Sequence, residues 1–141
     1  LVLPLRAGAG IASLATAGLP TVALRVPAHP AMRALIAASG PLAAPSANAS
    51  GRISPTRAAH VLRSLAGRIP LILDAGPTGH GVESTILAPE GGGVRLLRPG
   101  PISVEQLGVP VLEAPLAAIE APGQLASHYA PTKTLRLNAT V

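Results

Sequence analysis

The first third of the chain alternates between β-rich apolar runs and a helical pattern. Residues 1–5 and 19–26 are short runs rich in Leu and Val, which predicts two strands. From residue 30 to residue 39 the apolar side chains recur at helical spacing, and a proline precedes them. We therefore expect a helix there that ends at Gly40.

The middle of the chain predicts a second helix with a short strand on each side. Ser54 is expected to be its N-cap, with Pro55 in the first turn, because the apolar residues that follow recur at i, i+3, i+4 and i+7. Short apolar runs at 41–44 and 69–73 predict buried strands. The second of these would deliver Asp74 to a glycine-rich loop.

The last elements predicted are a hairpin and a short helix. Residues 84–88 and 94–97 form the hairpin strands around a glycine-rich turn, and Ser103 caps a helix that ends near Gly108. Residues 109–126 are rich in Pro and Ala without firm periodicity, which is typical of a linker. Because strands and helices alternate, we expect the α/β class with a mixed sheet.

Composition limits the chemistry more than the fold. The chain has 141 residues, the length of one ordinary domain, and its hydrophobic content of 48% is enough for a core. Cysteine is absent, which excludes disulfides, Cys-ligated zinc and thiol catalysis. No apolar run reaches the roughly 18 residues that a membrane span needs, so the expected location is the cytoplasm.

The net charge of +5 permits an anionic partner such as a nucleotide, pyrophosphate or RNA. Ten of the eleven basic residues are arginine, and they are scattered along the chain rather than clustered. The only aromatic residue is one Tyr, so stacking on bases is not favoured. A solvated basic surface is the alternative interpretation.

The stretch 43–56, AAPSANASGRISPT, is the strongest candidate for a site loop. Its hydroxyl and amide side chains bind oxygen atoms, and a helix N-terminus after it would suit phosphate. Loops around Ser84 and Arg98 also follow or flank strands, and such loops converge on ligand crevices in α/β proteins. Arg25 and Arg98 would bind phosphate or carboxylate through paired N–H groups.

Each candidate also has a structural explanation. On sequence alone, the commonest role of Ser54 is a helix cap. Neither Ser46 nor Ser84 lies in G-x-S-x-G, which disfavours a serine hydrolase, and the four histidines lack metal-ligand spacing. Asp74 and Glu83 bracket the glycine-rich loop, where they would bind Mg²⁺ or accept hydrogen bonds from loop amides; we favour the second.

Four segments together resemble the threonylcarbamoyl-adenylate synthase family with its YrdC-like domain. They are TVALRVPAHP at 21–30, PLAAPSANASGRISPT at 41–56, DAGPTGHGVESTI at 74–86 and LRPGPIS at 97–103. The resemblance covers roughly residues 1–107, and SHYAP at 127–131 extends it. It implies a YrdC-like twisted mixed sheet with flanking helices, incomplete at the amino terminus.

The resemblance implies a reaction of L-threonine, bicarbonate and ATP, with Mg²⁺ expected beside ATP. The product is threonylcarbamoyl-AMP, which serves tRNA modification, so tRNA or double-stranded RNA and other tRNA-modification proteins are further partners. No protein nucleophile and no protein metal site are implied. The resemblance assigns ATP contacts to Thr21, Ser46, Ser54, Arg98 and Tyr129, and threonine contacts to Arg25, Ala44 and Ser84.

The resemblance also predicts the division of the chain and its limits. Residues 1–108 would be the carboxy-terminal portion of the synthase domain, 109–133 a linker with the HYAP motif, and 134–141 the start of a second domain. The chain opens on an apolar run and lacks the family's amino-terminal basic motif. We therefore expect the amino-terminal part of the domain to be missing and the chain alone to be nearly inactive.

Two other functions stay open on sequence grounds. One is a related YrdC-like domain of a carbamoyl transferase used in hydrogenase maturation, but that class should lack the SHYAP segment. The other is a non-catalytic module that binds RNA, which the positive charge favours. Steeply salt-dependent tRNA binding without ATP affinity would distinguish that module from the enzyme.

Overall fold

The computed structural model describes residues 1–112, 119–121, 124, 131, 133 and 136. The chain divides into two compact units. The first, here called the sheet unit, comprises Leu1–Pro45 and Val82–Gln124. The second, here called the loop unit, comprises Ser46–Gly81 and Leu125–Val141. No helix among the described residues is long and apolar enough to cross a membrane.

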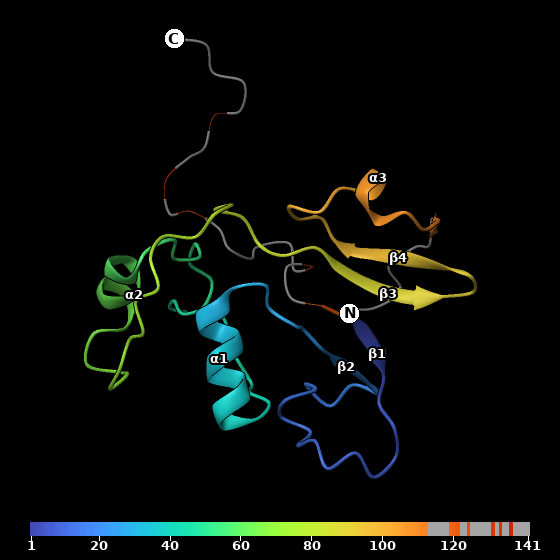
Figure 1. The fold of residues 1–141 in the computed structure, drawn as a ribbon, viewed down its shortest axis with the longest axis horizontal. Coiled ribbons are helices and arrows are strands. Elements are labelled where there is room, and N and C mark those ends of the chain that lie inside the picture. The colour runs from blue at the N-terminus through green and yellow to red at the C-terminus, as the bar shows by residue number, and fades with distance from the viewer. Residues whose placement is uncertain (113–118, 122–123, 125–130, 132, 134–135, 137–141) are drawn as a thin grey trace. The chain divides into compact units, whose positions relative to one another are not determined.

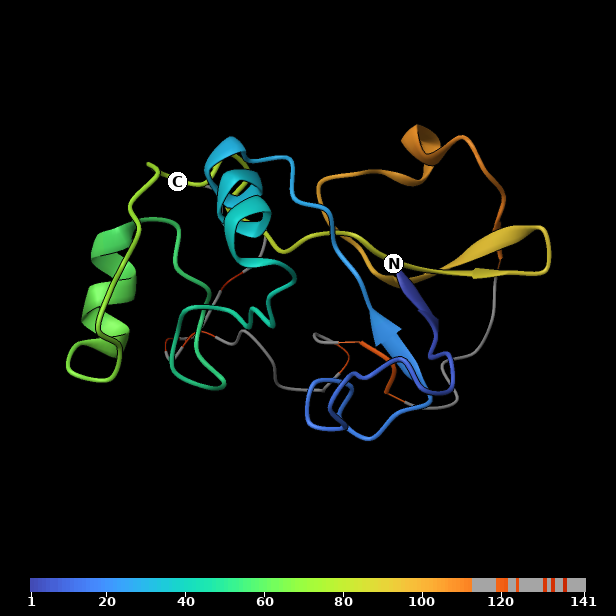
Figure 2. The same cartoon turned by 60° about the horizontal axis from the view of Figure 1, so that its bottom comes forward.

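The sheet unit begins with a two-stranded antiparallel ribbon (Figure 1). β1 (Val2–Pro4) pairs with β2 (Thr21–Ala23), in the register Val2 with Ala23 and Pro4 with Thr21. Both strands lie inside the predicted runs but are shorter. Beyond Ala23 the chain continues toward α1, which spans Pro30–Ser39 (Figure 2), and Val26 at the end of the predicted strand is 91% exposed.

The second sheet is a hairpin with a short third strand. β3 (Ile86–Glu90) and β4 (Gly93–Arg98) pair antiparallel, and β5 (Val111–Leu112) pairs parallel to β4. Both residues of the turn, Gly91 and Gly92, have positive φ, which a two-residue hairpin turn of this hand requires. β3 has the predicted length but begins two residues later, and β4 is two residues longer than predicted. The mixed sheet of the α/β class is confirmed.

A small aliphatic core joins these two sheets. Val2, Ala88, Leu97 and Ala121 are buried, and Ile86 packs against them. β1 contacts β3 directly, so the ribbon and the hairpin share this core. Ala121 comes from the stretch predicted to be a linker, and it brings that part of the chain into the sheet unit.

Two helices of the sheet unit confirm the sequence prediction. α1 (Pro30–Ser39) ends at Gly40, whose φ of 80° is the conformation that glycine adopts easily. α3 (Val104–Leu107) has Ser103 as N-cap, and the Ser103 N–H donates to Gln106 Oε1 at 2.9 Å. The helix closes at Gly108 in the left-handed region, as expected.

The structure corrects three predictions, two of them in the loop unit. α2 (Ala58–Leu65) has Arg57 as N-cap, so the prediction that Ser54 is the cap was wrong. The Thr56 N–H donates instead to His60 Nδ1 at 3.3 Å, which holds the entry turn outside the helix. Residues 41–44, in the sheet unit, and 69–73 are not strands. Leu71 is 70% exposed and has no strand partner among the described residues, and a strand needs a ladder partner.

Candidate functional site

In the sheet unit the structure brings together two of the predicted site residues, Arg98 and Ser84. Arg98 ends β4, and its Nε donates to the Ser84 carbonyl at 3.0 Å while its Nη2 donates to Ser84 Oγ at 3.1 Å. Glu83 Oε2 lies 3.9 Å from Nη2 and adds one negative charge. The two bonds fix the guanidinium plane, and only 11% of the Arg98 side chain is exposed.

The turn that follows Arg98 folds back against the segment that carries Ser84. Thr85 Oγ1 donates to the Ile102 carbonyl at 3.0 Å, and the Ile102 N–H lies 3.1 Å from the same oxygen. A Cβ atom at Gly100 would collide with the backbone N of Thr85 and lie 2.6 Å from the Glu83 carbonyl oxygen. The LRPG and EST segments therefore form one closely packed cluster.

The other predicted residues of the sheet unit lie on β2 and around α1. Thr21 is half-buried on β2, and Arg25 is exposed just after that strand. Ala44 is exposed in the irregular segment after α1. Thr21, Arg25 and Ala44 thus share one compact unit with Ser84 and Arg98, while direct side-chain contact is described only between the last two.

In the loop unit a network around Asn48 shapes the serine-rich segment. The Asn48 Nδ2 group donates to the carbonyls of Ala49 at 3.0 Å and of Arg52 at 2.9 Å. The Ala49 N–H donates to Ser64 Oγ on α2 at 2.8 Å. The segment is therefore held as a folded loop and is tied to α2, in agreement with the predicted loop rather than a strand.

Two predicted ATP contacts, Ser46 and Ser54, belong to the described part of the loop unit. Ser46 is exposed at the start of this loop, and Ser54 is half-buried just before α2. Tyr129 lies outside the described residues. The grouping of Ser46 and Ser54 with the sheet-unit residues into one site stays a prediction.

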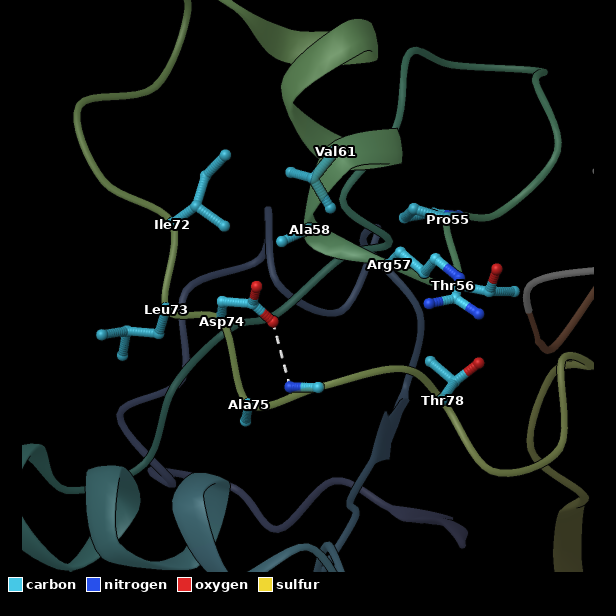
Figure 3. A pocket seen from close by; sticks show the side chains of 11 residues that line it. Pro55, Thr56, Arg57, Ala58, Val61, Ile72, Leu73, Asp74, Ala75 and Thr78 are labelled. Atoms are coloured by element: carbon cyan, nitrogen blue, oxygen red, sulfur yellow. Dashed lines mark hydrogen bonds between the residues drawn. The ribbon is translucent and has the colours of Figure 1, made fainter.

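A shallow pocket of about 160 Å³ lies between the start of α2 and residues 72–78 (Figure 3). Val61 and Ile72 form an apolar part of its lining, while Thr56, Arg57 and Thr78 are polar lining residues. The Thr78 N–H donates to the Thr56 carbonyl at 3.0 Å and so closes the loop. The pocket has room for a small group such as a phosphate or a methyl-bearing side chain.

Asp74 has the structural role that the sequence favoured. Its Oδ1 accepts a hydrogen bond from the Gly76 N–H at 3.0 Å, drawn as the dashed line in Figure 3. His60 accepts from Thr56 and is likewise structural. Across the described part of the chain, no group of three or more His, Asp or Glu side chains is arranged to hold a metal ion.

An ion-pair network holds the stretch near residue 120 against the hairpin. Arg95 on β4 bonds Glu90 at 2.5 Å and Glu120 at 2.9 Å. The hydrogen bond to Glu90, followed by that to Glu120, raises the pKa of Arg95 above its ordinary value. Gln124 then donates through Nε2 to the Leu97 carbonyl at 3.2 Å.

Sequence reasoning missed three residues that organise these clusters: Ser64, Gln124 and Thr85. Ser64 lies inside a helical pattern and Gln124 in an aperiodic stretch, so neither carried a local signal. Thr85 stands next to Ser84 in the EST segment. Only its position in that motif, and no physical pattern, would have drawn attention to it.

Comparison with known proteins shows which family this chain is similar to. A model of the Sua5–YciO–YrdC group, described as telomere recombination, matches residues 1–100. A threonylcarbamoyl-AMP synthase of Bacillus subtilis is 46% identical over 97% of this chain and 42% of its own length. That of Schizosaccharomyces pombe is 44% identical over 90% of this chain and 35% of its own length. The chain spans well under half the length of these curated relatives.

Comparison with solved structures shows that the fold also matches a member of this family. The crystal structure of Pyrococcus abyssi Sua5 complexed with L-threonine matches with a TM-score of 0.70 and 37% identity, over 96% of this chain and 40% of that one. A second structure of that protein, with a His and its neighbouring Tyr replaced by alanine, has a TM-score of 0.70 and 40% identity, over 79% of this chain and 36% of that one. On the sequence match and this shared architecture, the chain belongs to the Sua5–YciO–YrdC family.

Proposed function

We propose that this chain is part of an L-threonylcarbamoyladenylate synthase. The observation that carries the proposal is the Arg98–Ser84 cluster. It joins the LRPG and EST segments through two hydrogen bonds, within a chain that is 40–46% identical to three proteins named threonylcarbamoyl-AMP synthase. Arg98 is assigned to ATP and Ser84 to threonine, so their direct contact would place the two substrates side by side.

The reaction in this proposal needs positioned substrates rather than a protein nucleophile. The amine of threonine attacks the carbon of bicarbonate, and the carbamate forms with loss of water. A carbamate oxygen then attacks the α-phosphorus of ATP, the bond to the β-phosphate oxygen breaks, and pyrophosphate leaves. Orientation and electrostatic stabilisation of the developing charge would supply most of the rate enhancement.

The named side chains fit these requirements by their chemistry. A guanidinium at Arg98 suits phosphate oxygens, and its plane is already fixed by Ser84. A guanidinium at Arg25 suits the carboxylate of threonine, and Ala44 would border the threonine site. The P. abyssi relative was solved with L-threonine, which supports threonine as a substrate here.

The remaining ATP contacts would come from Thr21 and from the loop unit. Ser46 and Ser54 would contact ATP from the serine-rich loop, which the Asn48 network holds folded. Tyr129 belongs to the only His–Tyr pair in the chain. The P. abyssi variant with such a pair replaced supports a role for this dipeptide in the 109–133 linker.

Mg²⁺ would enter together with ATP. Magnesium bound with nucleotides is held largely by phosphate oxygens and water, with one or two carboxylates. Among the described residues, no group of three or more acidic or histidine side chains is arranged to hold a metal ion. Asp74 is engaged with Gly76, which leaves the phosphates as the main ligands.

The product would supply threonylcarbamoyl groups for tRNA modification in the cytoplasm. Direct tRNA contact and downstream modification proteins are part of this proposal. The net charge of +5 supports attraction to an anionic partner, whether nucleotide or RNA.

Pyrophosphate release by the full-length protein tests the proposal. We expect release only when L-threonine, bicarbonate and ATP are all present, with threonylcarbamoyl-AMP detected by mass spectrometry. Serine or glycine in place of threonine serves as the substrate control. ATP hydrolysis that is indifferent to threonine, or tRNA binding without ATP affinity, would show that the assignment is wrong.

A further inference from the structure

The hairpin has a β-bulge next to Arg98. Ile86 pairs with Arg98, but the next residue, Leu87, pairs with Leu96, so Leu97 is the extra residue on β4. An extra residue in a bulge loses its ladder partner and redirects the side chains beside it. The Leu97 carbonyl is therefore a backbone acceptor that needs another donor, since buried carbonyls are nearly always paired.

Gln124, the last residue of the sheet unit in the sequence, supplies that donor. Its Nε2 donates to the Leu97 carbonyl at 3.2 Å. Its Oε1 accepts from the N–H groups of Glu120 at 2.7 Å and Ala121 at 3.1 Å. The amide thus has two separate roles: the oxygen folds the turn at 120–121, and the nitrogen bonds the bulge.

We propose that Gln124 is a positioning residue for Arg98, which it orients by completing the hydrogen bonding of the bulge at Leu97. The Leu97 carbonyl belongs to the peptide group that leads into Arg98, so its direction sets where the Arg98 Cα–Cβ bond points. Arg98 in turn makes two hydrogen bonds to Ser84, both of which need that direction. The inference rests on the proposed function, in which Arg98 binds ATP.

Two substitutions separate the roles of the Gln124 amide. Gln124→Glu keeps the acceptor for Glu120 and Ala121 but removes the donor to Leu97. Gln124→Met removes both at similar volume. We expect each to weaken ATP binding by the full-length protein about tenfold, the change that corresponds to one hydrogen bond. The binding is measured by calorimetric titration with ATP.

Matched controls use the same chemistry elsewhere in the sheet unit. Gln106→Glu makes the identical change at a Gln whose oxygen accepts from the Ser103 N–H, and that acceptor is kept. Glu120→Gln removes the carboxylate that pairs with Arg95 but keeps the backbone N–H bonded to Gln124. Both should bind ATP within about twofold of the parent protein.

A double-mutant cycle distinguishes positioning from a general loss of stability. In an Arg98→Ala background, Gln124→Glu should weaken ATP binding no further, because the residue that it positions is gone. A tenfold effect in both backgrounds would show that Gln124 acts without Arg98 and would overturn the inference.

A second readout does not depend on ATP. The Arg98 Nε–H donates to the Ser84 carbonyl, so its exchange with solvent, followed by NMR in the ligand-free protein, reports its orientation. We expect exchange about tenfold faster in Gln124→Glu and unchanged in Gln106→Glu. Unchanged exchange in both would overturn the inference.

The outcomes separate this inference from the proposed function. If the parent protein binds ATP and Gln124→Glu binds it equally well, the positioning role is wrong and the synthase proposal stands. If the parent does not bind ATP, the proposed function fails. The exchange rate of Arg98 Nε–H then decides by itself whether Gln124 orients that side chain.

Discussion

At the scale of single residues, Gly100 shows how closely the turn after β4 packs against the Ser84 segment. Any Cβ there would meet the backbone of Thr85 and Glu83, and backbone atoms cannot move aside as a flexible side chain can. We expect Gly100→Ala to lower the free energy of unfolding of the full-length protein by about 1–3 kcal/mol, measured in urea. Gly79→Ala is the control, because no atom lies within 4 Å of a Cβ there.

Arg98 is the residue on which the site assignment depends most. Arg98→Ala removes the fixed guanidinium, and we expect ATP affinity to fall roughly 10- to 100-fold, as for the loss of a charge-assisted hydrogen bond. Arg98→Lys keeps the charge but not the planar fork, so it should give an intermediate loss. Arg33→Ala, at an exposed position on α1, is the control. Threonine-dependent ATP turnover that is unaffected in Arg98→Ala would refute the assignment.

Residue-scale prediction from sequence succeeded where chemistry and motif agreed. The loops around Ser84 and Arg98 were expected to converge because both lie at strand ends, and in the structure Arg98 Nη2 donates to Ser84 Oγ. The N-cap prediction for Ser54 was wrong because a proline directly after a serine is only a statistical signal. The contact between Thr56 and His60, four residues apart, moved the start of the helix to Ala58.

At the scale of elements, the bulged strand β4 contributes Leu97 to the core and Arg98 to the candidate site. Leu97 is only 5% exposed, and Arg98 follows it directly. We expect Leu97→Ala to destabilise the full-length protein by about 2–5 kcal/mol, the range for a truncated core leucine. Leu71→Ala, at a position that is 70% exposed, should change stability by less than about 0.5 kcal/mol. If the two substitutions lowered the free energy of unfolding equally in a urea titration, Leu97 would not be a core residue.

The short helix α3 gives a prediction about pH. The Glu105 carboxylate accepts a hydrogen bond from Ser103 and, to a smaller extent, one from its own backbone, and both lower its pKa below the ordinary 4.5. A lowered pKa means that the contribution to stability is present above pH 4.5 and is lost as the pH falls through the lowered value. The difference in the free energy of unfolding between the parent and Glu105→Gln should therefore shrink as the pH falls below 4.5. A difference that stays constant as the pH falls would show that Ser103 does not donate a stabilising hydrogen bond to the Glu105 carboxylate.

Helices and strands could be predicted where their formation does not depend on residues far away in the sequence. α1 and α3 ended at Gly40 and Gly108 as predicted, because a glycine C-cap is a local feature. The runs at 41–44 and 69–73 were predicted as strands from hydrophobicity, but a strand forms only beside a partner. β5 has two residues, which is too short for any periodicity to indicate it.

At the scale of the whole molecule, the balance of buried and exposed apolar residues limits what the chain does by itself. Among the described residues, four apolar residues are buried and sixteen large hydrophobic residues are exposed. A core of this size buries little surface to offset the conformational entropy of folding.

We therefore predict that the isolated 141-residue chain has little synthase activity. Pyrophosphate release dependent on threonine and bicarbonate should be below about 1% of that of the full-length protein, a loss that about 2.8 kcal/mol of transition-state stabilisation explains. Side-by-side assays at equal molar concentration measure this. Comparable release from the isolated chain would contradict the prediction.

The sequence by itself determined the family, the class of fold and the helices that end at a glycine, because motifs, glycine caps and helical periodicity are properties of neighbouring residues. It also determined which side chains are available for oxygen-rich substrates. Only the tertiary structure decided that Leu97 is a bulge residue, that Gln124 reaches it across 27 residues of chain, and that Arg98 is clamped to Ser84. These features depend on contacts between distant segments, and no local pattern specifies which donor meets an unpaired carbonyl.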